Sequence, residues 1–322
     1  MSRAAFGEPT QSRMLSTMVD LDLVSLNRSR AGISVSVFCA MLSLVGCRRD
    51  NPADVRAFGS AELFSADALR MPYVEASING SEPIRLMVDT GAGEALLLAN
   101  TIVEEFDLKT GAQSVVAGIG GTVEVDSVRI DRLSIGSIEC ANVIAFAPRE
   151  PSPLLLFFDG VIGTAVFGRA FVSLDFDKAR FVVAPAPLKA WESNLRFDIG
   201  PMGHIVTTAS LDGVSARALI DSGATASALT SDWHERYARG RILETPAPIL
   251  GLGDRAATMN VGGFEALELA GAEIRPFGAS VDNAFGLQVG LSIDLIIGMD
   301  VLTRASRVDI DYRAKAARIH WR

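Results

Sequence analysis

Two aspartates stand in matching segments of the chain, and their carboxylates are the groups from which we expect chemistry. Residues 86–92 and 218–224 each form an apolar run followed by Asp, a hydroxyl residue, Gly and Ala, and the aspartates are Asp89 and Asp221. A single turn of this type is most simply an Asp side chain that hydrogen-bonds its neighbouring backbone. Two matched turns instead suggest carboxylates that meet in the folded chain.

A pair of adjacent carboxylates has a defined chemistry. Both cannot ionise cheaply, so they share one proton over a wide pH range. The ionised partner takes a proton from water while the protonated partner donates one to a developing oxyanion. This is what the addition of water to a peptide carbonyl needs, and it requires neither a metal ion nor a nucleophilic side chain.

The matched turns belong to a longer internal repeat. Each aspartate is followed, in the same order, by a Gly-rich apolar turn, an apolar-apolar-Gly segment and a strand with alternating aspartates. The matched positions are Asp89 and Asp221, Gly120 and Gly253, Gly163 and Gly298, and Asp177 and Asp311, at offsets of 132, 133, 135 and 134 residues. Nearly constant offsets indicate a duplicated domain.

Length and composition indicate two mostly β domains. The 322 residues are enough for about two domains that each bury a core. The apolar runs are rich in Val, Ile and Leu and are separated by Asn-Gly or Asp-Gly. The formal charge of −8 argues against nucleic acid as a partner. His204, His234 and His320 have no metal-ligand spacing with Cys or with one another, so we expect no metal site.

Cysteine and aspartate side chains elsewhere in the chain could also be functional, but we favour a structural role for both groups. Cys140 has no paired histidine nearby, and we expect it to be a small buried apolar side chain without a role. The aspartates of the repeated strands alternate with apolar residues, which favours the outward face of a strand over a metal site. These aspartates are Asp175, Asp177, Asp309 and Asp311.

Each half is expected to open with a β-hairpin whose second strand delivers its aspartate into a glycine turn. Residues 71–78 and 84–88 flank Asn79-Gly80, and residues 204–211 and 216–220 flank Asp212-Gly213. Both dipeptides supply the positive φ of two-residue turns. Short helices are predicted over 100–106 and from a Ser231 cap to Tyr237. A closing hairpin ends each half, near Val183 and near Ile319.

The repeated pattern resembles the aspartic proteases of the pepsin and retropepsin type, here as two retropepsin-like lobes in one chain. The resemblance begins near residue 70 and rests on the Asp-Thr/Ser-Gly turn and the later apolar-apolar-Gly segment, which both halves carry. It implies an all-β fold of two pseudo-symmetric lobes with short helices. The expected divisions are a signal peptide over 1–46, a tether over 47–69, an N-terminal lobe over 70–184, a linker over 185–197 and a C-terminal lobe over 198–322.

The resemblance also implies roles for the residues of the two turns. Asp89 and Asp221 are the expected catalytic pair. Thr90 and Ser222 would cross-link the two turns through hydrogen bonds to the opposite lobe. The glycines would place backbone N–H groups near the carboxylate oxygens, and they are Gly91 and Gly223.

The Gly-rich turns resemble retropepsin flap tips. Glycine allows such a hairpin to close over an extended substrate and to bind its backbone, whereas the alternative is a pair of simple hairpin turns. Two flaps would make the chain more like a fused retropepsin dimer than like pepsin, whose flap tyrosine is missing here. The candidate flap residues are Gly118, Ile119, Gly120 and Gly121 in the first half and Gly251, Leu252 and Gly253 in the second.

The first turn departs from the pepsin pattern. Ala92-Gly93-Glu94 stands where pepsins place a hydroxyl residue that hydrogen-bonds the carboxylate, whereas Thr225 keeps one near that place in the second turn. We expect Glu94 to be a solvated surface charge. Loss of one such bond would let the pair titrate higher, so we predict a mildly acidic pH optimum.

The N-terminal segment predicts a location. Residues 31–46 are a mostly apolar, uncharged run preceded by two arginines, which suits a signal peptide better than a membrane span. The run ends before Cys47 in a sequence that resembles the lipobox of bacterial lipoproteins, in which the cysteine is lipidated. The alternatives are an uncleaved anchor or a later start at Met14 or Met18. We therefore expect a lipid-anchored protein of the bacterial cell envelope.

The leading hypothesis is an envelope-anchored aspartic endopeptidase that acts on peptide or protein substrates without a cofactor. A monomer is expected because one chain holds both aspartates. The main alternative is a catalytically silent peptide-binding lipoprotein with the same fold, although binding alone would not need both carboxylates. A third class is a structural envelope protein with a degenerate fold, which would not respond to a statine-type inhibitor.

Overall fold

Alternating apolar runs make this chain a β protein, as the sequence predicts. The computed structural model describes residues 36–37, 43–45, 53–66, 70–118, 121–187, 191–237, 242–250, 257–282 and 291–322. Residues 35–322 belong to one unit, which contains both repeats. Within the described part of the chain, no helix has the length and apolarity needed to cross a bilayer.

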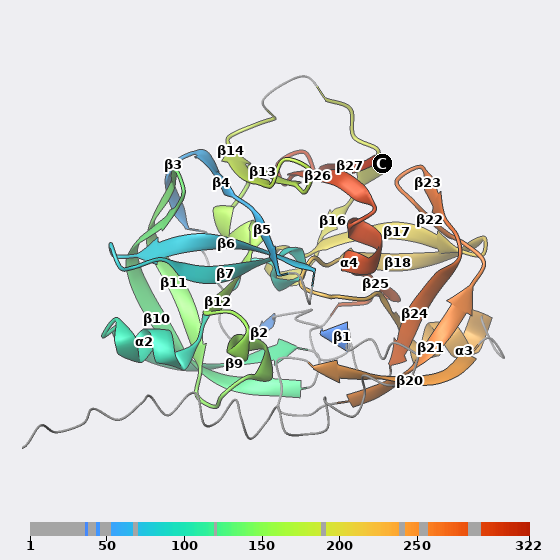
Figure 1. The fold of residues 1–322 in the computed structure, drawn as a ribbon, viewed down its shortest axis with the longest axis horizontal. Helices are drawn as coiled ribbons and strands as arrows, with labels where there is room; N and C mark the ends of the chain where they lie inside the picture. Colours follow the sequence, from blue (N-terminus) through green and yellow to red (C-terminus); the bar gives the residue numbers. More distant parts are fainter. Residues whose placement is uncertain are drawn as a thin grey trace, which may run out of the picture. The chain divides into compact units, whose positions relative to one another are not determined.

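The first repeat folds around a ten-stranded sheet (Figure 1). Its order is β2-β9-β10-β11-β8-β12-β7-β6-β5, with β3 paired to β11. Short helical segments connect the strands. The strands are β2 Ser43–Val45, β3 Asp54–Ala57, β5 Phe64–Ala66, β6 Met71–Ile78, β7 Ile84–Asp89, β8 Leu96–Leu98, β9 Thr110–Gly118, β10 Gly121–Ile135, β11 Ile138–Pro148 and β12 Gly160–Gly163, and the helical segments are η2 Thr90–Ala92, α2 Asn100–Glu105, η3 Pro153–Leu156 and η4 Thr164–Phe167.

The second repeat folds around an eleven-stranded sheet of the same plan. Its order is β1-β20-β21-β24-β19-β25-β18-β17-β22-β23, with β16 paired to β17. The strands are β1 Ser36–Val37, β16 Asp198–Ile199, β17 Ile205–Leu211, β18 Val214–Ile220, β19 Ala228–Thr230, β20 Ile242–Leu250, β21 Ala257–Phe264, β22 Leu267–Leu269, β23 Ala272–Ile274, β24 Phe277–Asp282 and β25 Leu295–Ile297, and the helical segments are η5 Pro201–Gly203, α3 Ser231–Tyr237 and α4 Met299–Leu302.

A six-stranded sheet joins the two lobes. Its order is β15-β27-β26-β13-β14-β4, so its central pair, β13 and β26, brings one strand from each repeat side by side. These two strands run antiparallel, with Leu174 opposite Val308 and Val172 opposite Ile310. The strands are β4 Gly59–Glu62, β13 Phe171–Asp175, β14 Arg180–Ala184, β15 Leu195–Arg196, β26 Ala305–Asp311 and β27 Ala316–Trp321.

The two lobes share one topology, which confirms the two-lobed, all-β fold predicted from the repeat. In the first lobe β12 pairs in parallel with β7 and antiparallel with β8. In the second, β25 pairs in parallel with β18 and antiparallel with β19. Each strand that ends in an Asp turn therefore has the apolar-apolar-Gly strand of its own lobe as its parallel neighbour.

In the closing hairpins, matching positions of the two repeats are separated by a different number of residues from the one that the sequence pattern suggested. Asp175 Oδ1 accepts the N–H of Lys178 and Asp311 Oδ1 accepts the N–H of Ala314, both at 2.9 Å, so the two turns match at 136 residues. The offset of 134, which aligned Asp177 with Asp311, was wrong for this element. Both halves carry Asp at two alternate positions, and the sequence alone aligned the wrong pair.

Both opening hairpins form, and the strands of the first match the predicted residues to within one position, although their pairing stops before the turn. The second has the expected two-residue turn, with positive φ at Asp212 and Gly213. In the first, Asn79 and Gly80 have positive φ, yet strand pairing between β6 and β7 stops at Ala76 and Ile84. Ile78 pairs with β10 instead, which draws the end of β6 away from β7.

Two local expectations are revised by the hydrogen bonds. Residues 54–66, which the sequence assigned to the tether, form β3, β4 and β5. Strands β3 and β5 extend the sheet of the first lobe, and β4 extends the interlobe sheet. Leu63 in this stretch is buried, so it contributes to the core. Helix α3 spans the predicted residues, but its N-cap is Thr230 rather than Ser231, because Thr230 Oγ1 accepts the N–H of Trp233 at 3.3 Å.

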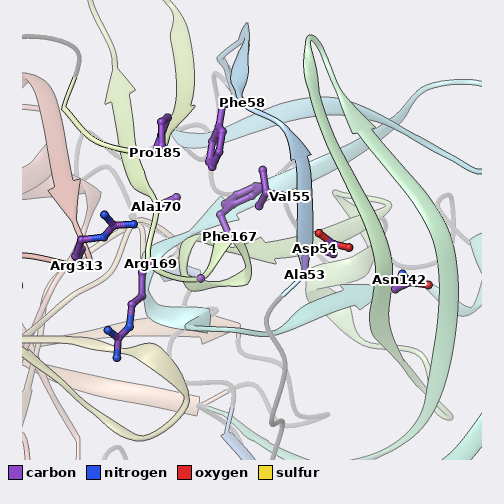
Figure 2. Close-up of a pocket in the computed structure, with 11 residues that line it drawn as sticks. Ala53, Asp54, Val55, Phe58, Asn142, Phe167, Arg169, Ala170, Pro185 and Arg313 are labelled. Carbon is purple, nitrogen blue, oxygen red and sulfur yellow. The ribbon is translucent and has the colours of Figure 1, made fainter.

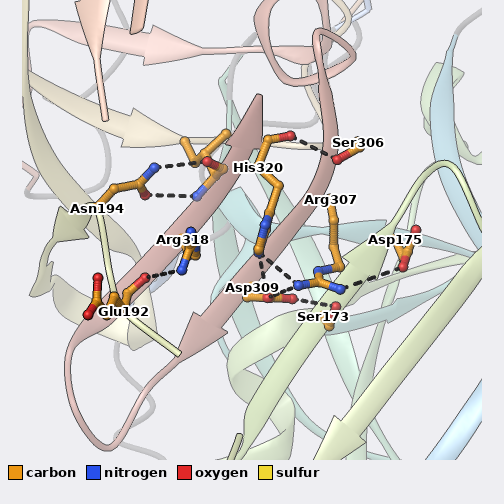
Figure 3. A network of polar contacts seen from close by, with 10 residues as sticks. Ser173, Asp175, Glu192, Asn194, Ser306, Arg307, Asp309, Arg318 and His320 are labelled. Atoms are coloured by element: carbon orange, nitrogen blue, oxygen red, sulfur yellow. Dashed lines mark hydrogen bonds and ion pairs between the residues drawn. The ribbon is translucent and has the colours of Figure 1, made fainter. Parts of the chain in front are cut away.

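The interlobe sheet buries Asp175 and Asp309, so the predicted outward position was wrong for these two aspartates, whereas Asp177 is exposed as predicted. Asp309 accepts a hydrogen bond from Ser173 Oγ at 2.6 Å, forms an ion pair with the Arg307 guanidinium at 3.1 Å and lies 2.9 Å from His320 Nε2 (Figure 3). Asp175 is also buried and lies 4.0 Å from Arg307. Because β13 and β26 occupy the centre of a six-stranded sheet, these carboxylates are covered by the side chains that neutralise them.

Candidate active site

Each predicted site aspartate ends a buried strand whose parallel neighbour ends in glycine. Asp89 lies opposite Gly163 at the end of β7, and the N–H of Asp221 donates to the carbonyl of Ile297 at 3.0 Å. A Cβ on Gly298 would lie 2.6 Å from the backbone of Ala226, so only glycine allows this turn to approach. The apolar-apolar-Gly segment is therefore the support on which each Asp turn rests.

Hydroxyl side chains cross-link the two turns reciprocally. Thr90 Oγ1 donates to the carbonyl of Ile220 at 2.8 Å and accepts the N–H of Ser222 at 2.9 Å. Ser222 Oγ donates to the carbonyl of Val88 at 2.8 Å and accepts the N–H of Thr90 at 3.0 Å. Four buried hydrogen bonds thus join residues about 130 positions apart, and each hydroxyl satisfies two backbone groups of the opposite lobe.

The cross-linked turns bring Asp89 and Asp221 face to face in a site where both are fully buried. Asp89 Oδ1 accepts the N–H groups of Gly91 at 2.7 Å and Ala92 at 3.1 Å, and Asp221 Oδ1 accepts the N–H of Gly223 at 2.9 Å. A Cβ on Gly91 would lie 2.6 Å from Cγ of Asp221. The glycine of one turn therefore packs against the carboxyl group of the other.

The electrostatics of this pair favour a shared proton. Burial raises the pKa of Asp221 well above its usual range, and the negative charge of Asp89 and a hydrogen bond with its carboxyl group raise it further. The N–H groups of Gly223 and Ala224 act in the opposite direction. One carboxyl group of the pair can therefore remain protonated while the other is ionised, which is the state required for paired acid and base chemistry.

Ser227 and Asp300 also support the second turn, and sequence reasoning missed both. Ser227 Oγ accepts the N–H of Gly298 at 3.1 Å and donates to the Asp300 carboxylate at 2.9 Å. Burial raises the pKa of Asp300. The first lobe has Ala95 and Ala165 at the matching positions of the repeat. A comparison of the two halves position by position would have revealed this polar pair.

The first turn departs from the pepsin pattern by lacking a hydroxyl residue after Ala92, and this departure has a structural cause. Gly93 has a φ of +58°, and its backbone lies so close to the Met202 carbonyl that no side chain fits there. The N–H of Glu94 donates to that carbonyl at 2.7 Å. Glu94 is half-buried beside Gly203, so it is not the fully solvated surface charge that we expected. Segment η5 of the second lobe occupies this position.

The two candidate flaps are hairpins, one in each lobe. Gly118 pairs with Gly121 at the end of the β9–β10 hairpin, and β20 pairs with β21 in the second lobe. Each of the strands β9 and β20 also accepts a short partner strand, β2 and β1 respectively. Several predicted residues lie outside the described part of the chain, namely Ile119, Gly120, Gly251, Leu252, Gly253 and the lipidation candidate Cys47.

Other features of the described residues lie away from the aspartate pair. A cavity of about 550 Å³ is lined by β3, η4 and the start of the linker, with Phe58 and Phe167 among its apolar residues and Arg313 at its edge (Figure 2). Neither aspartate of the pair lines it. Cys140 is buried as expected, and burial raises the pKa of its thiol to about 12. Among the described residues, no His, Cys, Asp and Glu side chains form a group that could hold a metal ion.

Comparison with known families matches both repeats. A profile described as aspartyl protease matches residues 74–166 and 207–301, which is more than half of the chain. Each matched segment contains one Asp turn and its apolar-apolar-Gly strand. A search of curated proteins finds no match to the chain.

Proposed function

The chain belongs to the aspartyl protease family, and we propose that it is an aspartic endopeptidase whose catalytic pair is Asp89 and Asp221. The observation that carries the proposal is the geometry of the two turns. Two fully buried carboxyl groups face each other and are fixed by reciprocal hydroxyl cross-links. A fold that only bound peptides would gain nothing from holding two buried carboxyl groups against each other, because this arrangement costs stability.

The proposed mechanism uses the shared proton. The ionised carboxylate accepts a proton from a water molecule, which attacks the peptide carbonyl, while the protonated carboxyl group donates to the carbonyl oxygen. When the tetrahedral intermediate collapses, its C–N bond breaks and the carboxyl group that gained the proton of the water donates it to the leaving nitrogen. The other carboxylate takes a proton from a hydroxyl group of the intermediate, which restores the starting state of the pair. The backbone N–H groups of Gly91 and Gly223 hold one oxygen of each carboxyl group, so both remain oriented throughout the reaction.

Substrate binding is proposed to use the outer edges of the flap strands. In the structure β9 pairs antiparallel with residues 43–45 and β20 pairs in parallel with residues 36–37, so both edges accept an extended segment. Main-chain pairing of this kind binds peptides with little dependence on sequence, and side-chain pockets then add preference. We propose that extended peptides occupy these edges when the chain's own N-terminal strands leave them.

The test of the proposed activity is cleavage of an unbiased peptide library between pH 3 and 8. Protein beginning at Arg48 is compared with the full chain and with Asp89→Asn and Asp221→Asn. Asp131→Asn is the matched control, because this side chain is 81 % exposed. We expect cleavage to be lost in both site variants and kept in the control, and to be faster without residues 1–47. Folded wild-type protein that binds library peptides but cleaves none would favour the silent peptide-binding protein.

Anchoring in the bacterial cell envelope is proposed from the sequence that precedes Cys47. Lipidation of this cysteine would place the protease domains at a membrane surface, with residues 48–52 as the remaining tether. Metabolic labelling with a fatty acid tests the proposal. Cys47→Ala is expected to abolish the label, whereas Cys39→Ala, eight residues earlier in the same apolar run, is expected to keep it. Full labelling of Cys47→Ala would contradict the proposed anchor.

A further inference from the structure

The closing hairpin of each lobe carries an aromatic residue at the same place, and the two residues differ in one hydroxyl group. The turns match through Asp175 and Asp311, so Phe176 corresponds to Tyr312. The N–H of Phe176 donates to the carbonyl of Ser306, and that of Tyr312 donates to the carbonyl of Ala170. Each aromatic residue is therefore anchored to the hairpin of the opposite lobe.

Both aromatic residues lie near the residue that directly follows the apolar-apolar-Gly segment of the opposite lobe. Tyr312 contacts this residue, and Phe176 shares a cavity with its counterpart. The Tyr312 hydroxyl lies 2.6 Å from Thr164 Oγ1, and both side chains are buried. In the other half, Phe176 and Met299 line one cavity of about 180 Å³. Thr164 and Met299 directly follow Gly163 and Gly298. The residue behind the first Asp turn therefore makes a polar contact with Tyr312, whereas the residue behind the second is apolar and shares a cavity with Phe176.

The polar contact is connected to Asp89 through the backbone. Thr164 follows the residue that pairs with Asp89 in the parallel strands. On either side of Thr164, the N–H of Gly163 donates to the carbonyl of Ala95 at 2.8 Å, and the N–H of Ala165 donates to the carbonyl of Gly93 at 3.0 Å. A shift of Thr164 would therefore displace the loop that holds the Asp89 carboxylate.

The phenol is also in electrostatic contact with this site. Burial raises the pKa of Tyr312, and the charges of Glu94 and Asp89 raise it further, while the hydrogen bond with Thr164 lowers it. The phenol therefore stays un-ionised in the pH range in which the aspartate pair titrates, and it acts on Asp89 by holding Thr164 in place. The ring itself packs edge-on against Phe197, with centroids 6.0 Å apart, which fixes the position of the hydroxyl group.

We propose that Tyr312 is a positioning residue for Asp89. The second lobe inserts its hydroxyl group behind the first Asp turn, holds Thr164 and gives the two carboxyl groups of the pair unequal surroundings. This role rests on the proposed protease activity. It also gives a reason for the difference between the halves, which carry Tyr312 and Thr164 in one and Phe176 and Met299 in the other.

The test begins with Tyr312→Phe, which gives this position the ring found at Phe176. On a peptide cleaved by the wild type, we expect kcat to fall about tenfold, the effect of one lost hydrogen bond, with KM changed less than about twofold. Tyr312→Phe combined with Thr164→Val removes both hydroxyl groups and leaves no buried donor or acceptor unpaired. Its stability should recover toward the wild type, whereas its kcat should remain low if the contact positions Asp89.

Ser173→Ala is the matched control, because Ser173 also donates a buried hydrogen bond between the lobes, to Asp309 at 2.6 Å. It should leave kcat within about twofold of the wild type. A second readout does not need turnover: carboxyl ¹³C NMR, with signals assigned by Asp89→Asn and Asp221→Asn, follows both titrations. We expect Tyr312→Phe to move the Asp89 titration by more than about half a pH unit and Ser173→Ala to leave it in place.

The outcomes separate this proposal from the proposed activity. Wild-type protein that cleaves no peptide overturns the protease function, and the NMR titration then still decides whether Tyr312 acts on Asp89. If Tyr312→Phe leaves both kcat and the Asp89 titration like those of Ser173→Ala, Tyr312 is only a packing residue. Recovery of kcat in the double variant would likewise refute positioning, because it would attribute the loss to one unpaired hydroxyl group.

Discussion

Replacing Thr90 with Val tests how strongly the hydroxyl cross-links join the two lobes. Valine keeps the shape of the side chain but removes the donor to Ile220 and the acceptor of the Ser222 N–H. Both backbone groups are then left buried without that partner, at about 1–3 kcal/mol each. With partial relaxation we expect the free energy of unfolding to fall by about 2–4 kcal/mol.

The assay is urea unfolding at neutral pH, followed by tryptophan fluorescence and far-UV circular dichroism. Thr207→Val is the control, because Thr207 Oγ1 donates one hydrogen bond, to the Arg196 carbonyl at 2.7 Å. It should cost about 1 kcal/mol. Ser222→Ala should match Thr90→Val, since the four bonds form two equivalent halves. A loss in Thr90→Val no larger than in Thr207→Val would refute the inference that the cross-links hold the turns together.

Three further predictions follow from the site and the interlobe sheet. Because the pKa of Asp221 is raised in the folded state, the folded protein binds more protons than the unfolded chain, whose Asp pKa is about 3.9. The free energy of unfolding should therefore decline as the pH rises above about 4. Asp221→Asn should weaken this pH dependence in thermal unfolding, and an unchanged pH dependence would contradict the raised pKa of Asp221. Gly91→Ala should lower peptide cleavage more than about 100-fold because its Cβ would meet the Asp221 carboxyl group. Gly213→Ala strains an exposed turn with positive φ but places its Cβ in open space, so it should keep activity; similar rates for the two variants would argue against the close approach. Asp309→Ala should lower the free energy of unfolding by about 2–4 kcal/mol, because it leaves the partly buried Arg307 without its closer carboxylate. A cost below about 1 kcal/mol would show that solvent compensates the charge of Arg307.

The repeat explains which parts of the structure were predictable from sequence. Asp89 and Asp221 were recognisable because an apolar strand must end in a glycine turn for a carboxylate to be presented, and this local pattern occurs twice. Helix α2 and the hairpin around Asp212-Gly213 were also found, because helix periodicity and turn residues act over a few positions. The mildly acidic optimum, the lipid anchor and the catalytic roles remain predictions.

Other features depended on contacts between segments far apart in the chain. The sequence places residues 54–66 in a tether, yet they form strands that pair with β11, β14 and β6. Asp309 alternates with apolar residues as a solvated side chain would, but its strand lies beside β13 of the other repeat and is covered. Neither outcome can be read from local polarity, since strand pairing decides which faces are exposed.

The sequence by itself determined the duplication, the β fold and the two Asp turns, because these follow from residue types within short windows. Only the tertiary structure decided how the halves differ where they meet. Tyr312 and Phe176 look alike as aromatic residues in matching turns. Tyr312 contacts a threonine of the opposite lobe, however, whereas Phe176 lines a cavity together with a methionine. Residues from both lobes surround each carboxyl group of the pair. Short sequence patterns cannot identify these residues, because the residues come together only in the folded chain.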